Sequence, residues 1–409
     1  MKSTVFSAAD ILLPPYGSND PRWESYGVIA CDQFTSEPEY WGKVASIAGD
    51  NLSCYGLVLP EAYLGTSLEN NHKAIVSENL KKVEEKLVKH ENCLIYIERT
   101  LPDGAVRAGL VGKIDLEAYD FSPDSKSFVR ATEETVISRI PPRVAVRKEA
   151  PVELPHVMVF ANDSEKMLIA PLANRKDEMT LLYSFDLMLG GGSICGYKIE
   201  GDLLSEITET IAKYEASDAD GLVYAMGDGN HSLASAKAHF ENIKASIGDA
   251  AMTCPARYAL VEVVDLYDSS IVFEHIYRIL TSCDAKDFLA YVNSRMSESE
   301  KTHKAIMICG KNECEIEIPA IHSLAVGSLQ MLIDDYISEK NTVECDYIHG
   351  TDSLRTLSEK EGSVGFICSG IEKDELFSYV SEYGNLPRKT FSMGEAVSKR
   401  YYIEARKIV

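Results

Sequence analysis

The chain has 409 residues and a formal net charge of −22, with 45% hydrophobic and 25% charged residues. This composition is typical of a globular protein that is long enough for two or three domains. The acidity argues against a chain that coats nucleic acid or an anionic membrane, so we expect neither as a partner.

Short β-like runs alternate with helical patterns in the first part of the chain, which indicates an α/β to α+β fold. We predict a strand at Tyr26–Ala30 that ends at Cys31-Asp32-Gln33. The following helix has the pattern of a capping box, with Ser36 as N-cap, Glu39 three residues later and Pro38 in the first turn. Further expected elements are strands at Leu57–Leu59, Cys93–Glu98 and Arg107–Val111 and a charged helix at Leu68–Lys89.

The middle of the chain contains Pro141-Pro142, which excludes a helix interior at that point. His156–Phe160 and Lys166–Ala170 are predicted to pair as strands around an Asn162-Asp163 turn. The glycine run Gly190-Gly191-Gly192 favours a hairpin loop, because it lacks the Lys-Ser/Thr of a P-loop. The next expected elements are a strand up to Ile199, a helix at Glu200–Ala216 and a short apolar strand at Leu222–Met226.

After Asp228 the apolar residues follow steps of three and four, which predicts a helix with one buried face. Strands are expected at Ala259–Val264 and Ile271–Ile276, and from about Thr302 the pattern becomes ββαβαβα. We therefore expect a mixed α/β core in residues 1–300 and a C-terminal α+β unit in residues 301–409.

The segment Asp228-Gly229-Asn230-His231-Ser232 joins a buried strand to a helix, which is where α/β proteins bind ligands. The N-terminus of that helix favours an anion, and Asp228 and His231 can bind a metal ion or move protons. The alternative is structural: Asp228 or Asn230 caps the helix, and His231 only packs in its first turn.

A second candidate segment is Arg130-Ala131-Thr132-Glu133-Glu134-Thr135. Arg130 suits bidentate contacts to phosphate, and Glu133 beside an arginine suits a general base. The alternative is a solvated helix start with local ion pairs. Two further arginines, Arg139 and Arg143, bracket the Pro pair and form either an anion clamp or ordinary surface ion pairs.

Asp32 and Gln33 follow the first predicted strand and lie at the same kind of ligand-binding edge. The ten cysteines are dispersed without a C-x-x-C pair, which argues against a zinc site and against a small disulfide framework. The N-terminal residues 1–15 lack the long apolar segment of a signal peptide, and no apolar run is long enough to span a bilayer. We therefore expect a reduced, cytoplasmic protein.

Several separated segments together resemble the bacterial and archaeal domain of unknown function 1015 family, which is often labelled ParB-like. These segments are Val28–Trp41, Arg130–Glu133, Arg139–Arg143, Gly227–Ser232, Asp346–Gly350 and Leu386–Gly394. The resemblance implies a ParB/sulfiredoxin-like mixed α/β core that binds nucleotides and is similar to enzymes that transfer phosphoryl groups, such as free-serine kinases.

The resemblance also implies roles for individual residues. Gly229, Asn230 and Ser232, together with Asp32 and Gln33, would contact the ligand. Asp228 or a neighbouring carboxylate would hold Mg²⁺ beside the phosphates of ATP or ADP. Asp228, His231 and Glu133 would be the catalytic groups, with Glu133 accepting the substrate proton.

One cation of the related motif is absent, because Ser232 stands where the relatives carry arginine. A phosphate-binding cation must then come from elsewhere, and Arg130 and Arg278 are the candidates. The leading hypothesis is a phosphotransferase acting on a hydroxyl metabolite. The alternatives are a non-catalytic nucleotide-binding regulatory protein and a partner-binding protein in which the turn is only a capped helix, and a homodimer is compatible with all three.

Overall fold

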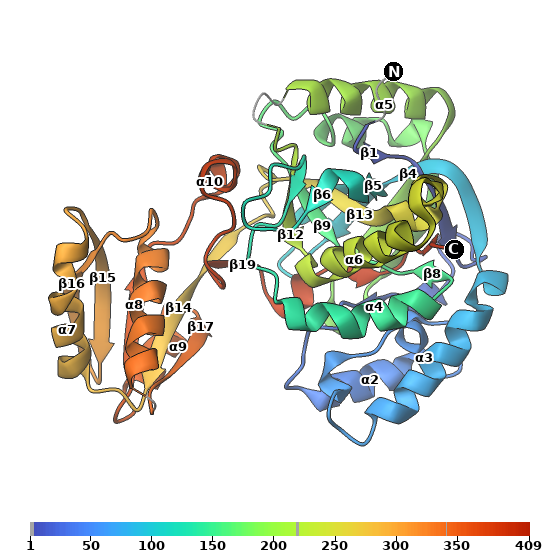
Figure 1. The fold of residues 1–409 in the computed structure, drawn as a ribbon. Helices are drawn as coiled ribbons and strands as arrows, with labels where there is room; N and C mark the ends of the chain where they lie inside the picture. Colours follow the sequence, from blue (N-terminus) through green and yellow to red (C-terminus); the bar gives the residue numbers. More distant parts are fainter. Residues whose placement is uncertain (1–3, 218–220, 341) are drawn as a thin grey trace. The chain divides into compact units, whose positions relative to one another are not determined.

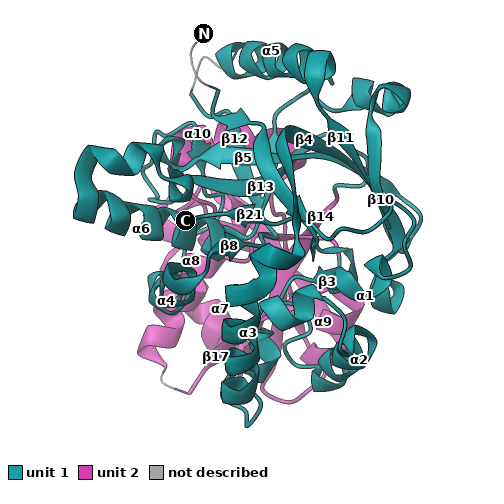
Figure 2. Cartoon of the chain, turned by 90° about the vertical axis from the view of Figure 1, so that its right-hand side faces the viewer, with its two compact units in different colours: residues 1–271, 395–409 teal, residues 272–394 magenta. Residues whose placement is uncertain are grey.

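The polypeptide forms two compact units. The computed structural model describes residues 4–217, 221–340 and 342–409. Unit 1 comprises Met1–Ile271 and Glu395–Val409, and unit 2 comprises Val272–Gly394 (Figure 2). Both units combine helices with a β-sheet, so the predicted mixed α/β class is confirmed.

The division into units differs from the expected boundary at residue 300. Strand β14 (Phe273–Thr281) pairs with β17 (Glu344–His349) and β18 (Val364–Cys368), so it belongs to unit 2. The end of the chain returns to unit 1, where β20 (Tyr401–Tyr402) pairs with β3 (Val28–Ile29). Local sequence patterns do not report pairing between distant segments, so they do not indicate that the end of the chain belongs to unit 1.

Unit 1 is built around a large mixed sheet (Figure 1). Within the described residues its main path is, in spatial order, β10 (Thr180–Asp186), β11 (Ser193–Ile199), β4 (Val88–Thr100), β5 (Val106–Asp115), β13 (Tyr258–Asp265), β9 (Met158–Ala161), β12 (Tyr224–Asp228), β7 (Val129–Arg130) and β6 (Tyr119–Asp120). In addition, β1 (Phe6–Ser7) pairs with β5, β2 (Ala9–Leu13) pairs with β4, and β21 (Arg406–Lys407) pairs with β8 (Val152–Glu153). The helices of this unit are α1 (Trp23–Tyr26), α2 (Pro38–Ala48), α3 (Glu69–Val83), α4 (Ile140–Glu149), α5 (Gly201–Ser217) and α6 (Asn230–Ile247).

Both faces of this sheet are buried, because its central strands carry continuous runs of apolar residues. In β4, Leu94 and Tyr96 belong to one core cluster, whereas Ile95 and Ile97 belong to another. The first cluster contains apolar side chains of α5 and α6, and the second contains those of α1 and α2. The sheet therefore lies between two layers and leaves its strand ends available for a site.

Two strand predictions for unit 1 are wrong for local reasons. Leu57–Leu59 is not a strand, because Cys54–Leu57 forms a short 3-10 helix. Lys166–Ala170 does not pair with β9, because the carboxylate of Asp163 accepts two backbone N–H groups of this segment at 2.9 and 2.7 Å and closes a turn. Side-chain-to-backbone bonds of this kind compete with strand pairing.

The predicted helix starts and turns of unit 1 have mixed outcomes. Helix α2 begins at Pro38 without a side-chain cap, so Ser36 and Glu39 do not form the expected capping box. Helix α4 begins at Ile140 and takes the proline pair into its first turn, where proline is tolerated. The glycine run at residues 190–192 lies in the β10–β11 hairpin connection, as predicted.

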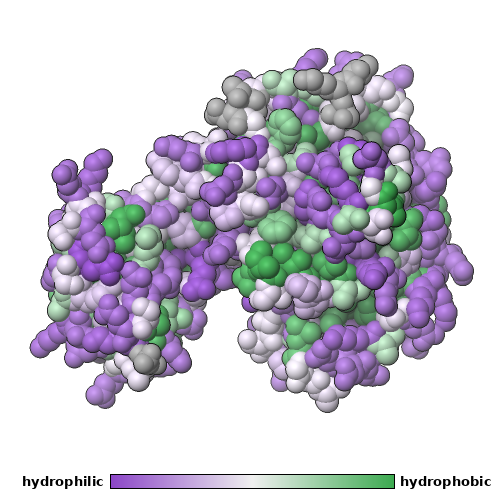
Figure 3. Space-filling model, viewed as in Figure 1, coloured by the Kyte–Doolittle hydropathy of each residue, from purple (hydrophilic) through white to green (hydrophobic). Residues whose placement is uncertain are grey.

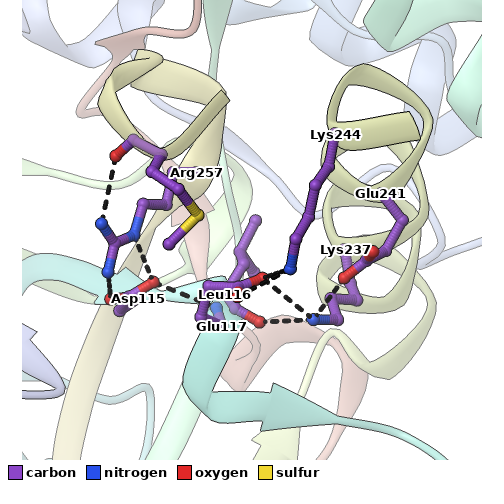
Figure 4. Close-up of polar contacts among 8 residues, drawn as sticks. Asp115, Leu116, Glu117, Lys237, Glu241, Lys244 and Arg257 are labelled. Carbon is purple, nitrogen blue, oxygen red and sulfur yellow. Dashed lines mark hydrogen bonds and ion pairs between the residues drawn. The ribbon is translucent and has the colours of Figure 1, made fainter. Parts of the chain in front are cut away.

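Helix α6 is fixed by ion pairs to the turn that follows β5 (Figure 4). Lys244 Nζ donates to both carboxylate oxygens of Glu117 at 2.8 and 2.7 Å, and Lys237 Nζ donates to the Leu116 carbonyl at 2.9 Å. Asp115 at the end of β5 pairs with Arg257. These contacts hold the middle of α6 against the sheet and so fix the direction in which its N-terminus points.

The substitution Glu117→Gln is expected to lower the free energy of unfolding of unit 1 by about 1 kcal/mol, because two lysines lose their carboxylate partner. Urea unfolding followed by tryptophan fluorescence measures this change. The matched control is Glu241→Gln, which breaks the more exposed pair with Lys237 (side chain of Glu241 46% exposed) and should cost less than half as much. Equal losses in the two variants would show that Glu117 does not anchor the helix.

Asp265 ends β13 as a buried carboxyl group whose Oδ1 accepts the backbone N–H of Tyr267 at 2.9 Å. Burial, together with the nearby Asp163 and Asp268, raises the pKa of Asp265 to about 6 from its ordinary value of 3.8. Because the pKa is higher in the folded state, the stabilisation is fully present below the unfolded pKa and is lost as the pH rises through about 6.

The substitution Asp265→Asn retains the acceptor oxygen for Tyr267 but cannot ionise. It is expected to raise the free energy of unfolding by about 1–3 kcal/mol at about pH 8 and to leave it unchanged at about pH 4. Urea unfolding at both pH values tests this. The control is Asp103→Asn, an exposed residue that accepts a similar backbone bond from Ala105. A gain that is the same at both pH values would contradict the ionisation argument.

Unit 2 contains a separate sheet covered by helices, and the elements predicted from Thr302 onward are present in the expected order. Helices α7 and α8 contribute Phe288, Leu329 and Ile333 to its core. The spatial order of its main strands is β16 (Asn312–Pro319), β15 (Thr302–Cys309), β18, β14 and β17, with β19 (Phe391–Met393) paired to β14. Its helices are α7 (Ala285–Ser294), α8 (Ala325–Glu339), α9 (Thr351–Ser358) and α10 (Leu376–Tyr383).

Among the described residues, none of the helices combines the length and the apolar character needed to cross a membrane.

Candidate functional site

The candidate site lies at one edge of the large sheet of unit 1. Strand β7 runs parallel to β12, and β9 runs antiparallel to β12 with Asp228 opposite Met158. The carboxyl ends of β7 and β12 and the start of β9 therefore share this edge. It brings together the Arg130 segment, the Asp228 turn and His156, of which the sequence predicts the first two as functional.

Helix α6 starts at this edge without a side-chain cap. Its N-cap is Gly229, which has a φ of +84°. A Cβ atom at this position would lie 3.0 Å from Val157 Cα, so the position requires glycine. Asp228 Oδ1 accepts the Gly229 N–H at 2.8 Å, and Asn230 Oδ1 is buried without a hydrogen-bond partner. The alternative in which Asp228 or Asn230 caps the helix is thus wrong, because no side chain caps the start of α6.

Inside the first turn of α6, the Ser232 N–H donates to the Gly229 carbonyl at 2.9 Å, so this N–H is already occupied. The side chain of Ser232 is half-buried. His231 accepts the backbone N–H of Val136 on its Nε2 at 3.2 Å. His231 is therefore fixed against the Arg130 segment, and its neutral form carries its ring proton on Nδ1.

A cation faces the Asp228 turn from the C-terminal end of the chain. Lys399 Nζ lies 3.6 Å from Asp228 Oδ2, and its side chain is 13% exposed. The backbone around it is held by two buried arginines: Arg99 donates to the carbonyls of Val397 and Lys399, and Arg107 donates to the Ser398 carbonyl. Lys399 therefore places a positive charge beside the Asp228 turn.

Asp32 and His156 form a second pair of neighbouring polar groups in the site. Asp32 Oδ2 lies 3.9 Å from His156 Nε2, and Gln33 Nε2 donates to Asp32 Oδ1 at 3.0 Å. Burial alone would raise the pKa of Asp32, but His156, the Gln33 hydrogen bond and Lys399 outweigh it, and the pKa lies below its ordinary value. Asp32 is thus a carboxylate at neutral pH, and Gln33 serves to orient it.

The Arg130 segment leaves β7 and runs beside the start of α6. The Thr132 hydroxyl donates to the Met226 carbonyl at 2.8 Å in β12, which fixes the segment to the strand that ends at Asp228. Arg130 is 2% exposed, and its Nε donates to the Ser127 carbonyl at 2.8 Å. Glu133 is half-buried on the same segment. The structure brings both residues to the site edge, and their roles in binding and proton transfer stay predictions.

The rim of the site carries exposed apolar side chains. Val136, which bonds His231 through its N–H, is 45% exposed, and the neighbouring Ile137 is 63% exposed. Figure 3 shows hydrophobic surface on the face of unit 1 that carries α4 and α6 in Figure 1. Apolar residues beside a polar cluster are typical of small-molecule sites.

The other predicted cations have partners of their own. Arg278 lies in unit 2 with 0% exposure, and its guanidinium donates to Gln330 Oε1 and to the Ile276 and Arg388 carbonyls. A guanidinium bound in this way within the core of unit 2 is not available to a phosphate. Arg143 pairs with Glu61, which favours the ion-pair alternative over an anion clamp.

A buried network of charged residues lies next to Lys399 in the sequence and holds the backbone there. Arg400 Nε donates to Glu262 Oε2 at 2.7 Å, and its Nη2 donates to Glu404 Oε2 at 2.9 Å. Tyr183 donates its hydroxyl proton to the other oxygen of Glu404. Burial alone would lower the pKa of Arg400, but Glu404 and Glu262 raise it above its ordinary value. Because Arg400 directly follows Lys399, this network fixes the direction of the lysine side chain.

Sequence patterns miss Lys399 and His156. Lys399 belongs to no motif and lies far along the chain from the residues that it faces. The available signal for His156 is its position at the start of the predicted strand His156–Phe160, two residues ahead of Met158, which pairs with Asp228.

Among the described residues, no group of three or more His, Cys, Asp and Glu side chains could hold a metal ion. A Mg²⁺ ion at Asp228, as expected from the sequence, would therefore have a single carboxylate ligand from this turn. The Asp228 Oδ2 atom lies 3.6 Å from Lys399 Nζ.

Residues 13–332 match the family described as "Protein of unknown function (DUF1015)". The comparison supports this family alone and does not support the further ParB-like assignment. No curated protein matches the sequence.

Three solved structures show a distant likeness to this chain. A free serine kinase variant in complex with AMP aligns at 10% identity over 72% of this chain and 91% of that chain, with a TM-score of 0.41. A conserved hypothetical protein from Pyrococcus furiosus aligns at 11% identity over 71% and 93%, with a TM-score of 0.37. C-terminally truncated SbnI from Staphylococcus aureus aligns at 10% identity over 72% and 81%, with a TM-score of 0.34. Likenesses of this size are too weak to carry an argument about the site.

Proposed function

The chain belongs to the DUF1015 family of proteins of unknown function, and from the geometry of its site we propose that it is a nucleotide-dependent phosphotransferase acting on a hydroxyl group of a small metabolite. One observation carries this proposal: the uncapped start of α6 lies beside the pair of Asp228 and Lys399. The choice of a nucleotide as the phosphate donor rests on the sequence resemblance.

The start of α6 supplies the phosphate-binding part of the site. The N-terminal N–H groups of a helix and its dipole attract an anion, and here no side chain caps the helix. Lys399 lies 3.6 Å from Asp228 and adds a positive charge on the same side. The terminal phosphate of ATP or ADP would contact the backbone of Asn230 and His231 and the ammonium group of Lys399.

Asp32 supplies the base in this proposal. The substrate hydroxyl gives its proton to the Asp32 carboxylate while its oxygen forms a bond to the terminal phosphorus. The bond from that phosphorus to the bridging oxygen breaks, and the shortened nucleotide leaves. The gap of 3.9 Å between Asp32 Oδ2 and His156 Nε2 suits a hydroxyl group that accepts from His156 and donates to Asp32.

A magnesium ion would neutralise phosphate charge at Asp228. Mg²⁺ in nucleotide sites commonly takes one or two protein carboxylates and fills its remaining positions with water and phosphate oxygens. Asp228 would supply the single carboxylate of that pattern through Oδ2, which lies 3.6 Å from Lys399 Nζ, since its Oδ1 accepts the Gly229 N–H.

The first experiment is a thermal-shift series with ATP, ADP, AMP and adenosine, each with Mg²⁺ and with a chelator. We expect stabilisation by the nucleotides that carry phosphates and none by adenosine, because the phosphate makes the charged contacts. Phosphorus NMR of the protein with the best nucleotide and a panel of hydroxylated metabolites then follows transfer.

The outcomes separate the candidate functions. Phosphorylation of one hydroxyl compound supports the transferase. Binding without consumption, accompanied by a change in oligomeric state, supports a non-catalytic nucleotide-binding regulatory protein. If none of ATP, ADP and AMP stabilises the protein, the start of α6 does not bind nucleotide phosphate and the proposal is wrong.

A further inference from the structure

Tyr402 lies behind the proposed base and has no part in the step described above. Strand β20 pairs antiparallel with β3 so that Tyr402 lies opposite Val28, and the chain reaches Asp32 a few residues after β3. The Tyr402 side chain is buried, with 3% of the residue exposed. Its hydroxyl group therefore ends under the loop that carries Asp32, next to His156.

Three groups surround the Tyr402 hydroxyl oxygen. The Cys31 backbone N–H donates to it over 3.3 Å, His156 Nδ1 lies 2.8 Å away and Cys31 Sγ lies 3.1 Å away. The amide already uses one lone pair of the oxygen, so the phenol is better placed to donate than to accept. Burial raises the pKa of Tyr402 well above its ordinary value, so the phenol keeps its single proton.

His156 Nδ1 is the stronger of the two acceptors for that proton, because an imidazole nitrogen accepts better than a thiol sulfur. A neutral imidazole that accepts on Nδ1 carries its own proton on Nε2. That Nε2–H points toward Asp32 Oδ2, 3.9 Å away. A hydroxyl group between them would accept from Nε2–H and be left with its proton directed at Asp32.

Cys31 Sγ is a second hydrogen-bond acceptor for the Tyr402 phenol proton. When His156 takes up a second proton, its Nδ1–H must donate to the Tyr402 oxygen, and the phenol proton can then turn to Cys31 Sγ. Burial raises the pKa of Cys31 to about 12, so the sulfur stays an uncharged thiol in both states. The same heavy-atom positions thus serve both protonation states of His156.

We propose that Tyr402 is a positioning residue for His156, fixing the neutral imidazole with its proton on Nε2 so that a substrate hydroxyl is oriented toward Asp32. This inference rests on the proposed function for its purpose, but the position of the ring proton is independent of any nucleotide. Among the described residues, the charge of Asp32 acts on Tyr402 and on Cys31, those of Glu61 and Arg143 act on Cys31, and that of Lys399 acts on Asp32.

Nitrogen NMR of the His156 ring in the ligand-free protein tests the proposal. We expect the neutral wild-type ring to show an unprotonated Nδ1 and a protonated Nε2. Because Asp32 also attracts the proton to Nε2, the decisive comparison is made in the Asp32→Asn background. There, the Nε2–H form should persist with Tyr402 present, and adding Tyr402→Phe should produce a measurable fraction of the Nδ1–H form.

The matched control is Cys31→Ala, which changes the neighbour of the phenol but leaves Nδ1 as its acceptor, so the Nε2–H form should be retained. A wild-type ring with its proton on Nδ1 would overturn the proposal, and so would an unchanged tautomer when Tyr402→Phe is added to Asp32→Asn. If the phenylalanine variant does not fold, the spectrum of the single variant Asp32→Asn still decides, because loss of the Nε2–H form with Tyr402 present would overturn the proposal. Nucleotide binding by the wild-type protein, measured separately, shows whether the proposed function fails on its own.

Discussion

Replacing Arg400 by methionine is expected to lower the free energy of unfolding of unit 1 by about 3–5 kcal/mol. Arg400 bonds the buried carboxylates of Glu262 and Glu404 at 2.7 and 2.9 Å, and Glu404 is completely buried. The methionine would leave both carboxylates in the core without their cation. Urea unfolding followed by tryptophan fluorescence reports on this unit alone, because the two tryptophans of the chain, Trp23 and Trp41, both lie in it.

A matched control for this variant is Arg175→Met. Arg175 also joins two carboxylates, those of Glu178 and Glu206, but these lie at the surface with 45% and 59% of their side chains exposed. Surface pairs contribute about 1 kcal/mol or less, so this variant should change the unfolding free energy only slightly. Comparable losses in the two variants would contradict the view that a buried charge network supports the site.

Replacing Lys399 by methionine is expected to weaken nucleotide binding at least about tenfold, which corresponds to about 1.4 kcal/mol. The ammonium group is the cation 3.6 Å from Asp228 at the open start of α6, and methionine keeps most of its volume without the charge. Isothermal titration with ADP measures the affinity. Raising the salt concentration should weaken ADP binding to the wild-type protein more than to the variant, because salt screens the attraction between the Lys399 ammonium group and the phosphate, which the variant lacks.

The control for Lys399→Met comes from the same C-terminal segment. Lys407 is 47% exposed on its side chain and pairs with Glu84, away from the Asp228 turn. Lys407→Met removes the same charge from the chain, so both variants have the same net charge. Equal affinities of the two variants for ADP would show that Lys399 does not contact the phosphate.

The parts of the site that can be predicted from the sequence are those set by neighbouring residues. An apolar strand, a turn with glycine and a helix with a three-and-four apolar pattern place the Asp228 turn at a strand end, and the structure has β12 and α6 there. The Arg130 segment is placed at the same edge by its parallel pairing with β12. In both places the local pattern and the fold agree.

The parts that cannot be predicted depend on contacts between distant residues. Lys399 reaches Asp228 because the end of the chain pairs with β3, and no pattern around residue 399 indicates this. The opposite error occurs at Arg278, where a promising cation lies in the core of unit 2 with its donors in use. The capping alternative for Asp228 and Asn230 fails because Gly229 takes the N-cap position in a left-handed conformation, and glycine has no side chain to cap the helix.

The most direct test of phosphate binding at the start of α6 is the backbone amide NMR spectrum of the full chain during titration with ADP. We expect the largest shifts at the amides of Asn230 and His231, where the terminal phosphate would contact the helix start, and we expect no such shifts with adenosine. Shifts of the same size elsewhere in the chain, with these two amides unmoved, would contradict the claim that the start of α6 binds phosphate.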